Sequence, residues 1–161
     1  MTARARQPVI GAGQARRAKV QAAGYVGGLL ADRGAVLLCG GRSGVMAAAC
    51  RGAAQRSEIS PGLLPGDDVL DANPHLAVAL PTGAGHARDA VAVLAGSAVG
   101  GTGTLSEIAP APRSGKRVIG LRPWKAHDAR SEPAAVRAAA SPQEAVDLAL
   151  ATGSPGQDGG T

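Results

Sequence analysis

The stretch AVLLCGGRSGVMAAACRGA, residues Ala35–Ala53, contains a strand pattern, a glycine turn and a helix pattern in immediate succession. Its first five residues are all apolar and predict a strand buried on both faces, as in a parallel sheet. Glycines permit the tight turn that follows, Ser43 is predicted to cap the helix, and Val45 to Cys50 are good helix formers. A helix that begins here directs unpaired backbone N–H groups and its positive dipole end at the space above the strand, where a phosphate can bind.

Two interpretations of this turn are open on sequence grounds. It is either an ordinary strand-to-helix connection of an α/β fold or a phosphate-binding turn, and three glycines beside an arginine favour the second. No Lys-Ser or Lys-Thr pair follows the turn, so it is not a P-loop. The residues predicted to bind phosphate here are Gly40, Gly41, Arg42, Ser43, Gly44, Val45 and Met46.

Composition limits the class of protein. The 161 residues suggest one domain, and 45% of them are hydrophobic, yet there is no Phe, and Tyr25 and Trp124 are the only aromatic residues. A core of small aliphatic side chains predicts modest stability or help from an oligomer partner. The net charge of +5 is mostly arginine and is scattered. This pattern favours a small phosphorylated ligand over nucleic acid, which is not expected as a partner.

Cys39 and Cys50 have neither zinc-ligand spacing nor a CxxC pattern, so they are interpreted as reduced core residues of a protein in a reducing compartment, the cytoplasm. The N-terminus has no apolar run that would mark a signal peptide, and no segment is long enough to span a membrane. The three histidines and the Asp67-Asp68 pair lack matching ligands, so no metal site is predicted.

Strand and helix patterns alternate along the chain, which predicts a single three-layer α/β domain over residues 1–150, with a mostly parallel sheet and helices on both faces. Residues 151–161, rich in Gly and Pro from Gly153 on, are predicted to form a disordered tail. Pro61 is predicted either to confine its strand to a sheet edge or to shorten it, and Ala98–Val99 is too short for a full strand. The predicted strands are Pro8–Ala12, 35–39, Ile59–Pro65, Leu76–Leu80 and Arg117–Leu121, and the last of these is predicted to lie inside the sheet.

The helix patterns are of unequal clarity. The Gln14–Asp32 segment has one apolar stripe and is ended by Gly34. A helix from His86 is expected to direct Val91, Leu94 and Ala95 inward. Ser141-Pro142-Gln143-Glu144 combines a cap, a first-position proline and a glutamate that reaches back, with Val146 and Leu150 on the buried side. The stripe residues of the first helix are Val20, Ala23, Gly24, Gly27, Leu30 and Ala31.

A second glycine turn lies near Glu107, and both glycine turns follow strands, whose carboxyl ends form the binding edge of a parallel sheet. Thr104 and Glu107 fit a capping box, which alone explains the glutamate. In the functional interpretation, Glu107 activates a water or holds a ribose hydroxyl, and Arg88 clamps a phosphate instead of lying on the surface. The second turn consists of Gly100, Gly101, Thr102, Gly103 and Thr104.

These motifs resemble the LOG-type Rossmann proteins, long labelled "possible lysine decarboxylase". The resemblance covers about Pro8 to Leu150 and rests on 40–46, on Pro81-Thr82-Gly83 with Arg88, and on 101–107. The segments Gly62–Gly66 and Asn73-Pro74 look most like the bacterial branch that contains molybdenum-cofactor carrier proteins. The resemblance implies a Rossmann-like fold and a homodimer or higher homo-oligomer, and no lysine stands out as a pyridoxal-phosphate anchor.

The resemblance implies two functions. Carrier members bind a phosphorylated pterin without turnover. Hydrolase members cleave a nucleoside 5′-monophosphate to base and ribose 5-phosphate, and there Arg88 and Glu107 match catalytic residues while the glycine turns hold the phosphate, with Thr82 and Gly83 in the same site. No cofactor is required; the expected ligand is a nucleotide monophosphate or a molybdopterin-type compound. Asp89 stands where the hydrolases carry lysine, which favours the carrier.

Overall fold

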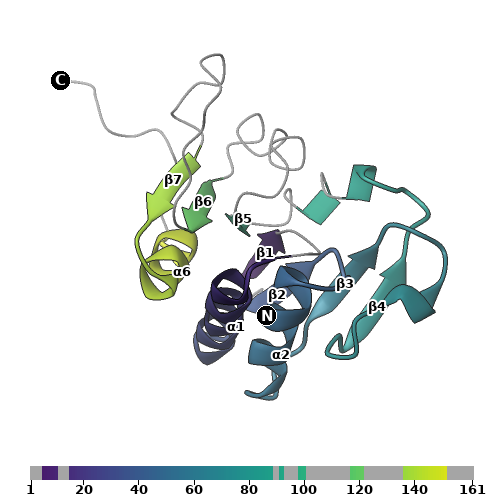
Figure 1. Cartoon of the computed structure of the whole chain (residues 1–161), viewed down its shortest axis with the longest axis horizontal. Coiled ribbons are helices and arrows are strands. Elements are labelled where there is room, and N and C mark those ends of the chain that lie inside the picture. Colours follow the sequence, from purple (N-terminus) through teal and green to yellow (C-terminus); the bar gives the residue numbers. More distant parts are fainter. Residues whose placement is uncertain are drawn as a thin grey trace, which may run out of the picture.

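The computed structural model describes residues 5–10, 15–88, 91–92, 98–100, 117–121 and 136–151, and these form one parallel sheet with helices packed against it (Figure 1). The sheet has seven strands in the order β4-β3-β2-β1-β5-β6-β7. The fold is therefore α/β and Rossmann-like, as predicted. The strands are β1 (Arg6–Ile10), β2 (Val36–Cys39), β3 (Pro61–Leu64), β4 (Val78–Pro81), β5 (Ala98–Gly100), β6 (Val118–Leu121) and β7 (Val136–Ala139).

The direction of the chain across the sheet reverses beside β1. Strands β2, β3 and β4 are added on one side of β1, and β5 then pairs with its other side, Val9 lying between Cys39 and Val99. All six pairings are parallel, so the carboxyl ends of the strands lie along one rim. In open parallel sheets, ligands bind beyond this rim where the strand order reverses.

Three helices, α1 (Arg17–Asp32), α2 (Val45–Ala54) and α6 (Pro142–Leu150), form one layer, in which α1 contacts both α2 and α6 (Figure 1). Helices α1 and α2 approach very closely. A β-carbon added to Gly27 would lie 1.9 Å from the Ala49 carbonyl oxygen, and one added to Gly52 would lie 2.0 Å from that of Gly24. Small residues at the crossing let the backbones touch, which fixes the position of α2 above β1 and β2.

The core between this layer and the sheet is aliphatic, as the composition predicts, and its largest fully buried side chains include Leu30, Leu37 and Ile119. Along β2, Leu37 and Cys39 are buried, whereas Val36 and Leu38 are only half-buried. The prediction of a strand fully buried on both faces was therefore wrong: the face of β2 toward α1 and α2 is packed more tightly than the other.

Several other predictions need correction. Strand β1 begins at Arg6, before the predicted Pro8, and β3 lies inside the sheet between β2 and β4. The edge position was therefore wrong, but the alternative that Pro61 shortens its strand is confirmed, because β3 begins at Pro61 and not at the predicted Ile59. Val91 is 59% exposed, not inward, and the neighbouring Ala92 is buried instead.

Strand β7 was missed, because the sequence VRAA has little strand character. The 3₁₀ helix η1 (Val69–Asp71) lies in the segment predicted as a loop. The short strand β5 pairs with β1 on one side and β6 on the other, and this pairing stabilises a three-residue strand that has little strand propensity of its own.

Other predictions are confirmed. Helix α1 ends at Asp32, and Gly34 follows it with a φ of 67°. Strand β6 lies inside the sheet. Within the described residues, no helix is long and apolar enough to cross a membrane. Leu94, Ala95, the helix expected after Thr104 and the predicted tail from residue 152 onward lie outside the described residues.

Candidate phosphate-binding site at the end of strand β2

The turn between β2 and α2 has a backbone that only glycine adopts easily. Gly41 has a φ of 75° and Gly44 a φ of 69°. Gly44, and not Ser43, is the N-cap residue of α2, and it has no side chain that could make a capping hydrogen bond. The prediction that Ser43 caps the helix was therefore wrong. Arg42 and Ser43 are exposed at the tip of the turn.

The first turn of α2 offers backbone donors. No described residue accepts a hydrogen bond from the N–H groups of Val45, Met46 or Ala47, and the first intrahelical bond of this end runs from the Ala48 N–H to the Gly44 carbonyl. These are the groups that bind an anion when a helix begins beside a ligand. One amide of the turn is engaged: the Gly41 N–H donates to Cys39 Sγ at 3.3 Å.

Asn73 holds the turn through hydrogen bonds to the carbonyl oxygens of Gly41 and Arg42. It is 7% exposed, and its Nδ2 donates to the carbonyl oxygens of Gly41 at 3.1 Å and Arg42 at 3.3 Å. The Asn73 N–H also donates to Gly41 O at 2.9 Å, and its Oδ1 accepts from the His75 N–H at 3.0 Å. Sequence reasoning assigned Asn73 to a loop and gave it no role; its signal was the Asn-Pro pair in the family resemblance.

Arg88 links the start of the turn to strand β3. Strands β2 and β3 are paired at Cys39 and Gly62, and beyond this pair Arg88 Nη1 donates to Gly40 O at 2.8 Å and to Leu63 O at 2.9 Å. The side chain is 7% exposed, so the interpretation of Arg88 as a surface arginine is excluded. A β-carbon on Gly40 would lie 2.1 Å from Nη1, which explains why glycine stands there.

Thr82 and Gly83 follow β4, at the same rim but two strands from β2. The Thr82 hydroxyl donates to Leu64 O at 2.7 Å and accepts from the Ala84 N–H at 3.2 Å. The Gly83 N–H donates to Gly66 O at 3.0 Å. In this structure these groups hold the turn after β4 together, so their predicted contact with ligand would require that turn to rearrange.

The second glycine turn is only partly described. Gly100 ends β5 and pairs with Ile10 of β1, which separates the two turns by one strand along the same rim. Gly101, Thr102, Gly103, Thr104 and the predicted catalytic Glu107 lie outside the described residues. Neighbouring strands are about 4.8 Å apart, so the two turns leave the sheet about 10 Å from each other, within reach of one nucleotide-sized ligand.

Two thiols lie directly beneath the first turn. Cys39, the last residue of β2, and Cys50 of α2 are both buried, and their sulfur atoms are 3.4 Å apart. Both are free, as predicted. No group of three or more His, Cys, Asp or Glu residues in the described part of the chain could hold a metal ion.

Comparison with known proteins points to one family. A model of the SLOG cluster4 family matches residues 7–148. An uncharacterised protein of Archaeoglobus fulgidus is 40% identical over 119 residues, which cover 71% of this chain and 78% of that protein.

Solved structures with the same fold include proteins named for a cofactor. The molybdenum cofactor binding protein of the phototrophic bacterium Rippkaea orientalis is 32% identical, with a TM-score of 0.81 over 92% of this chain and 96% of that one. The molybdenum cofactor carrier protein of Chlamydomonas reinhardtii is 29% identical, with a TM-score of 0.79 over 91% and 95%. These similarities extend over nearly the whole chain.

Proposed function

The chain belongs to the SLOG cluster4 family, and on this premise we propose that it is a carrier protein that binds a small phosphorylated ligand at the two glycine turns. The ligand is a molybdopterin-type compound or a nucleoside monophosphate. The names of the two similar structures support a cofactor-binding role, and the geometry at the end of β2 supports the phosphate.

The observation that carries the proposal is the first turn of α2. Three backbone N–H groups there have no acceptor among the described residues, and the bonds of Asn73 and Arg88 to the carbonyls of Gly40 and Gly41 hold the turn in place. Such a preformed set of donors binds phosphate without a large ordering cost. The exposed Arg42 adds a guanidinium that can pair with phosphate oxygens in a bidentate manner.

A phosphoribohydrolase with Arg88 and Glu107 as catalytic residues is the second candidate, carried by the family resemblance. The contacts of Arg88 favour the carrier, because its Nη1 donates to two main-chain carbonyls and thereby positions the glycine turn. In the carrier, Gly100 to Thr104 contribute the second half of the phosphate site.

The experiment that tests the proposal compares AMP and molybdopterin with adenosine, which has the base and ribose but no phosphate. We expect at least one of the two phosphorylated compounds to raise the melting temperature, adenosine to have no effect, and no free adenine to be released from AMP. Release of adenine at a steady rate would establish the hydrolase. If neither compound shifts the melting temperature and no adenine is released, both candidates are contradicted.

A matched pair of variants locates the site. Arg42→Gln removes the cation at the start of α2, and Arg51→Gln removes an equally exposed cation in the last turn of the same helix. We expect Arg42→Gln to weaken binding of the phosphorylated compound about tenfold, as for loss of one charge-assisted hydrogen bond, and Arg51→Gln to leave it unchanged. Equal effects of the two variants would place the ligand elsewhere.

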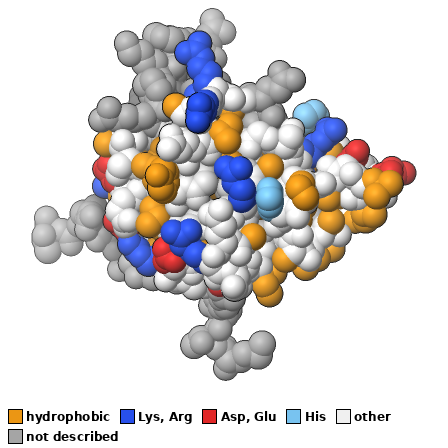
Figure 2. Space-filling model, turned by 60° about the horizontal axis from the view of Figure 1, so that its bottom comes forward, with side chains coloured by type: hydrophobic (Ala, Val, Ile, Leu, Met, Phe, Trp, Pro, Cys, Tyr) orange, Lys and Arg blue, Asp and Glu red, His pale blue; other side chains and the backbone are white. Residues whose placement is uncertain are grey.

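We also propose that the chain is a cytoplasmic homodimer in which the edge strand β4 contributes to the contact. Val78 and Leu80, on one face of β4, are 44% and 45% exposed, and Val69 and Leu70 of η1 are exposed nearby. Hydrophobic side chains gather in Figure 2 at the end of the molecule that carries these elements in Figure 1. Light scattering should give twice the chain mass, and Leu80→Lys should give a monomer.

A further inference from the structure

We propose that Cys39 and Cys50 are a modification site: a buried dithiol that a peroxide converts to a disulfide, which releases the Gly41 N–H at the base of the glycine turn. The two residues lie on different elements, the end of β2 and the middle of α2, on opposite sides of the turn. No role for the pair follows from binding phosphate, and a hydrophobic core needs no thiols.

The distance between the two sulfur atoms supports the bond. They are 3.4 Å apart, already in contact, and a disulfide requires about 2.05 Å, so the bond needs only a short further approach of the two sulfur atoms. The bond would close a short loop that contains the whole of the glycine turn. Disulfides of cytoplasmic proteins are usually transient and serve redox sensing, which fits thiols that are free in this structure.

The surroundings distinguish the two thiols chemically. The hydrogen bond from Cys39 lowers the pKa of Cys50, and the same hydrogen bond, together with burial, raises the pKa of Cys39. Asn73 Nδ2 donates to Cys50 Sγ at 3.9 Å, and hydrogen bonds from Asn73 and Ser60 also lower the pKa of Cys50. Because Cys50 has these additional donors, it is the sulfur that ionises and attacks first, with Cys39 as the partner that resolves the intermediate.

Ser60 is a further polar neighbour of Cys50. Its side chain is fully buried, and its hydroxyl lowers the pKa of Cys50 as a hydrogen-bond donor to the sulfur. The same hydroxyl can donate to a sulfenic acid formed on Cys50.

The reaction takes one hydrogen peroxide and returns two waters. The Cys50 thiolate attacks one peroxide oxygen, the O–O bond breaks, and the departing hydroxide takes up the proton that Cys50 lost, leaving a sulfenic acid and water. The Cys39 sulfur then attacks the sulfenic sulfur. The S–S bond forms, the S–O bond breaks, and the hydroxyl leaves with the Cys39 proton as the second water.

The consequence reaches the proposed ligand site through Gly41, whose N–H now donates to Cys39 Sγ. Movement of that sulfur toward Cys50 removes the acceptor, so the N–H becomes available at the turn. If the proposed function holds, the oxidised protein gains one donor to phosphate and binds the phosphorylated ligand more tightly, by about tenfold.

The test uses the full-length folded chain, which has two cysteines only. The chain is treated with hydrogen peroxide, unfolded, alkylated and weighed by mass spectrometry. We expect loss of two hydrogen atoms and of both alkylation sites, restored by dithiothreitol, and a monomeric band on a non-reducing gel. The Cys39→Ser variant should stop at a trapped sulfenic acid on Cys50, whereas Cys50→Ser should react far more slowly.

Two alkylated thiols after treatment, oxidation beyond the sulfenic acid without a disulfide, or a cross-linked dimer would each overturn the proposal. The Gly41 amide is followed by NMR in the same samples: oxidation should shift its resonance and speed its hydrogen exchange, and an unchanged amide would refute its release. These readouts need no ligand. A failure of AMP and molybdopterin to bind either redox form would therefore count against the proposed function and not against the disulfide.

Discussion

Helices α2 and α6 lie in the same layer of the molecule, but they begin in opposite ways. At the start of α6, Ser141 Oγ accepts from the Glu144 N–H at 3.2 Å, Pro142 has no N–H to satisfy, and the Glu144 carboxylate accepts from the Ala140 N–H at 2.7 Å. At the start of α2, Gly44 supplies no side chain, and the amides that follow have no acceptor among the described residues.

The two helix starts are therefore stabilised by different interactions. Capping chemistry closes most of the first turn of α6, because Pro142 has no N–H and the Glu144 and Ala145 N–H groups both donate to Ser141. This cap stabilises the helix by about 1 kcal/mol. Helix α2 has no such cap and relies on its packing against α1 and on the bonds of Asn73 and Arg88 for its position. An uncapped helix that is held firmly by other contacts is suited to binding an anion.

The largest effect is expected when α2 is pushed away from α1. In Gly27→Ala the new methyl group meets the Ala49 carbonyl oxygen at 1.9 Å, and backbone on both sides cannot yield, so we expect a loss of about 3 kcal/mol in the free energy of unfolding. Urea denaturation measures it. Gly24→Ala is the control, since its nearest neighbour lies at 3.6 Å and alanine favours a helix. Equal losses in the two variants would refute the close crossing.

The second largest effect is expected when the turn before α2 is disturbed and the helix itself is left intact. Asn73→Ala removes the side-chain donors to Gly41 O and Arg42 O and the acceptor of the His75 N–H, and Gly41 O keeps only its bond from the N–H of residue 73, at a total cost of about 2 kcal/mol. We expect the melting shift produced by the phosphorylated ligand to disappear as well, because the turn loses its preformed shape. A variant that is less stable but binds normally would show that Asn73 supports the fold alone.

Most of the strands and the glycine turn could be predicted from the sequence, because they depend on local pattern. Apolar runs followed by glycines predicted β2 and its turn, and the Ser141–Glu144 motif predicted the start of α6. Strand β7 could not be found, because Val136–Ala139 is held by pairing with β6 and not by its own propensity. Likewise, no feature of the sequence around β3 indicates that β4 pairs with its outer edge and places β3 inside the sheet.

The glycines of the site could be predicted from the sequence, but the side chains that hold the turn in place, Asn73 and Arg88, could not. Gly41 and Gly44 have positive φ values that the sequence pattern anticipates. The bonds of Asn73 and Arg88 to the turn join residues 31 to 48 positions apart in the chain, and such contacts depend on the folded arrangement. The pairing of Cys39 with Cys50 also required the structure, since a separation of 11 residues fits neither a metal motif nor a redox motif.

A smaller effect is expected at the capped end. Ser141→Ala removes the acceptor for the Glu144 N–H and should lower the free energy of unfolding by about 1 kcal/mol, while Ser141→Thr retains most of it. Binding of the phosphorylated ligand should be the same in both variants, since α6 packs against β5 to β7 and not against the β2 turn. A loss of binding in Ser141→Ala would contradict the claim that the ligand binds at the start of α2 and not at the start of α6.

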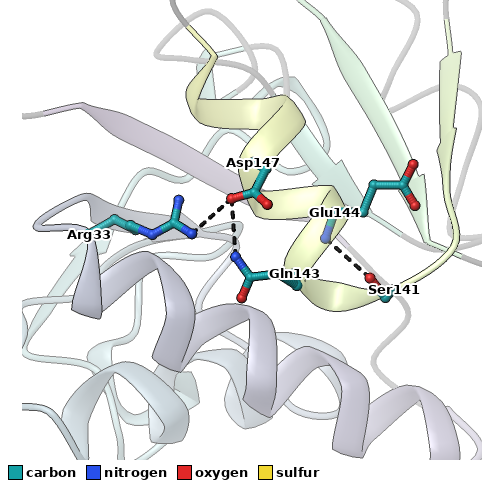
Figure 3. A network of polar contacts seen from close by, with 5 residues as sticks. All are labelled: Arg33, Ser141, Gln143, Glu144 and Asp147. Carbon is teal, nitrogen blue, oxygen red and sulfur yellow. Dashed lines mark hydrogen bonds and ion pairs between the residues drawn. The ribbon is translucent and has the colours of Figure 1, made fainter.

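The smallest effect concerns the charges that fasten α6 to α1 (Figure 3). Arg33 at 2.8 Å, followed by Gln143 at 3.1 Å, lowers the pKa of Asp147 from its ordinary value of 3.8. Because the folded pKa is the lower one, the carboxylate stabilises the fold above pH 3.8, and this contribution is lost as the pH falls through the folded value. Arg33→Gln should raise the pKa of Asp147 in an NMR titration, and Gln143→Ala should raise it less, since the guanidinium is the larger cause. The reverse order would mean that the exposed ion pair is screened by solvent and that the hydrogen bond within α6 holds the carboxylate.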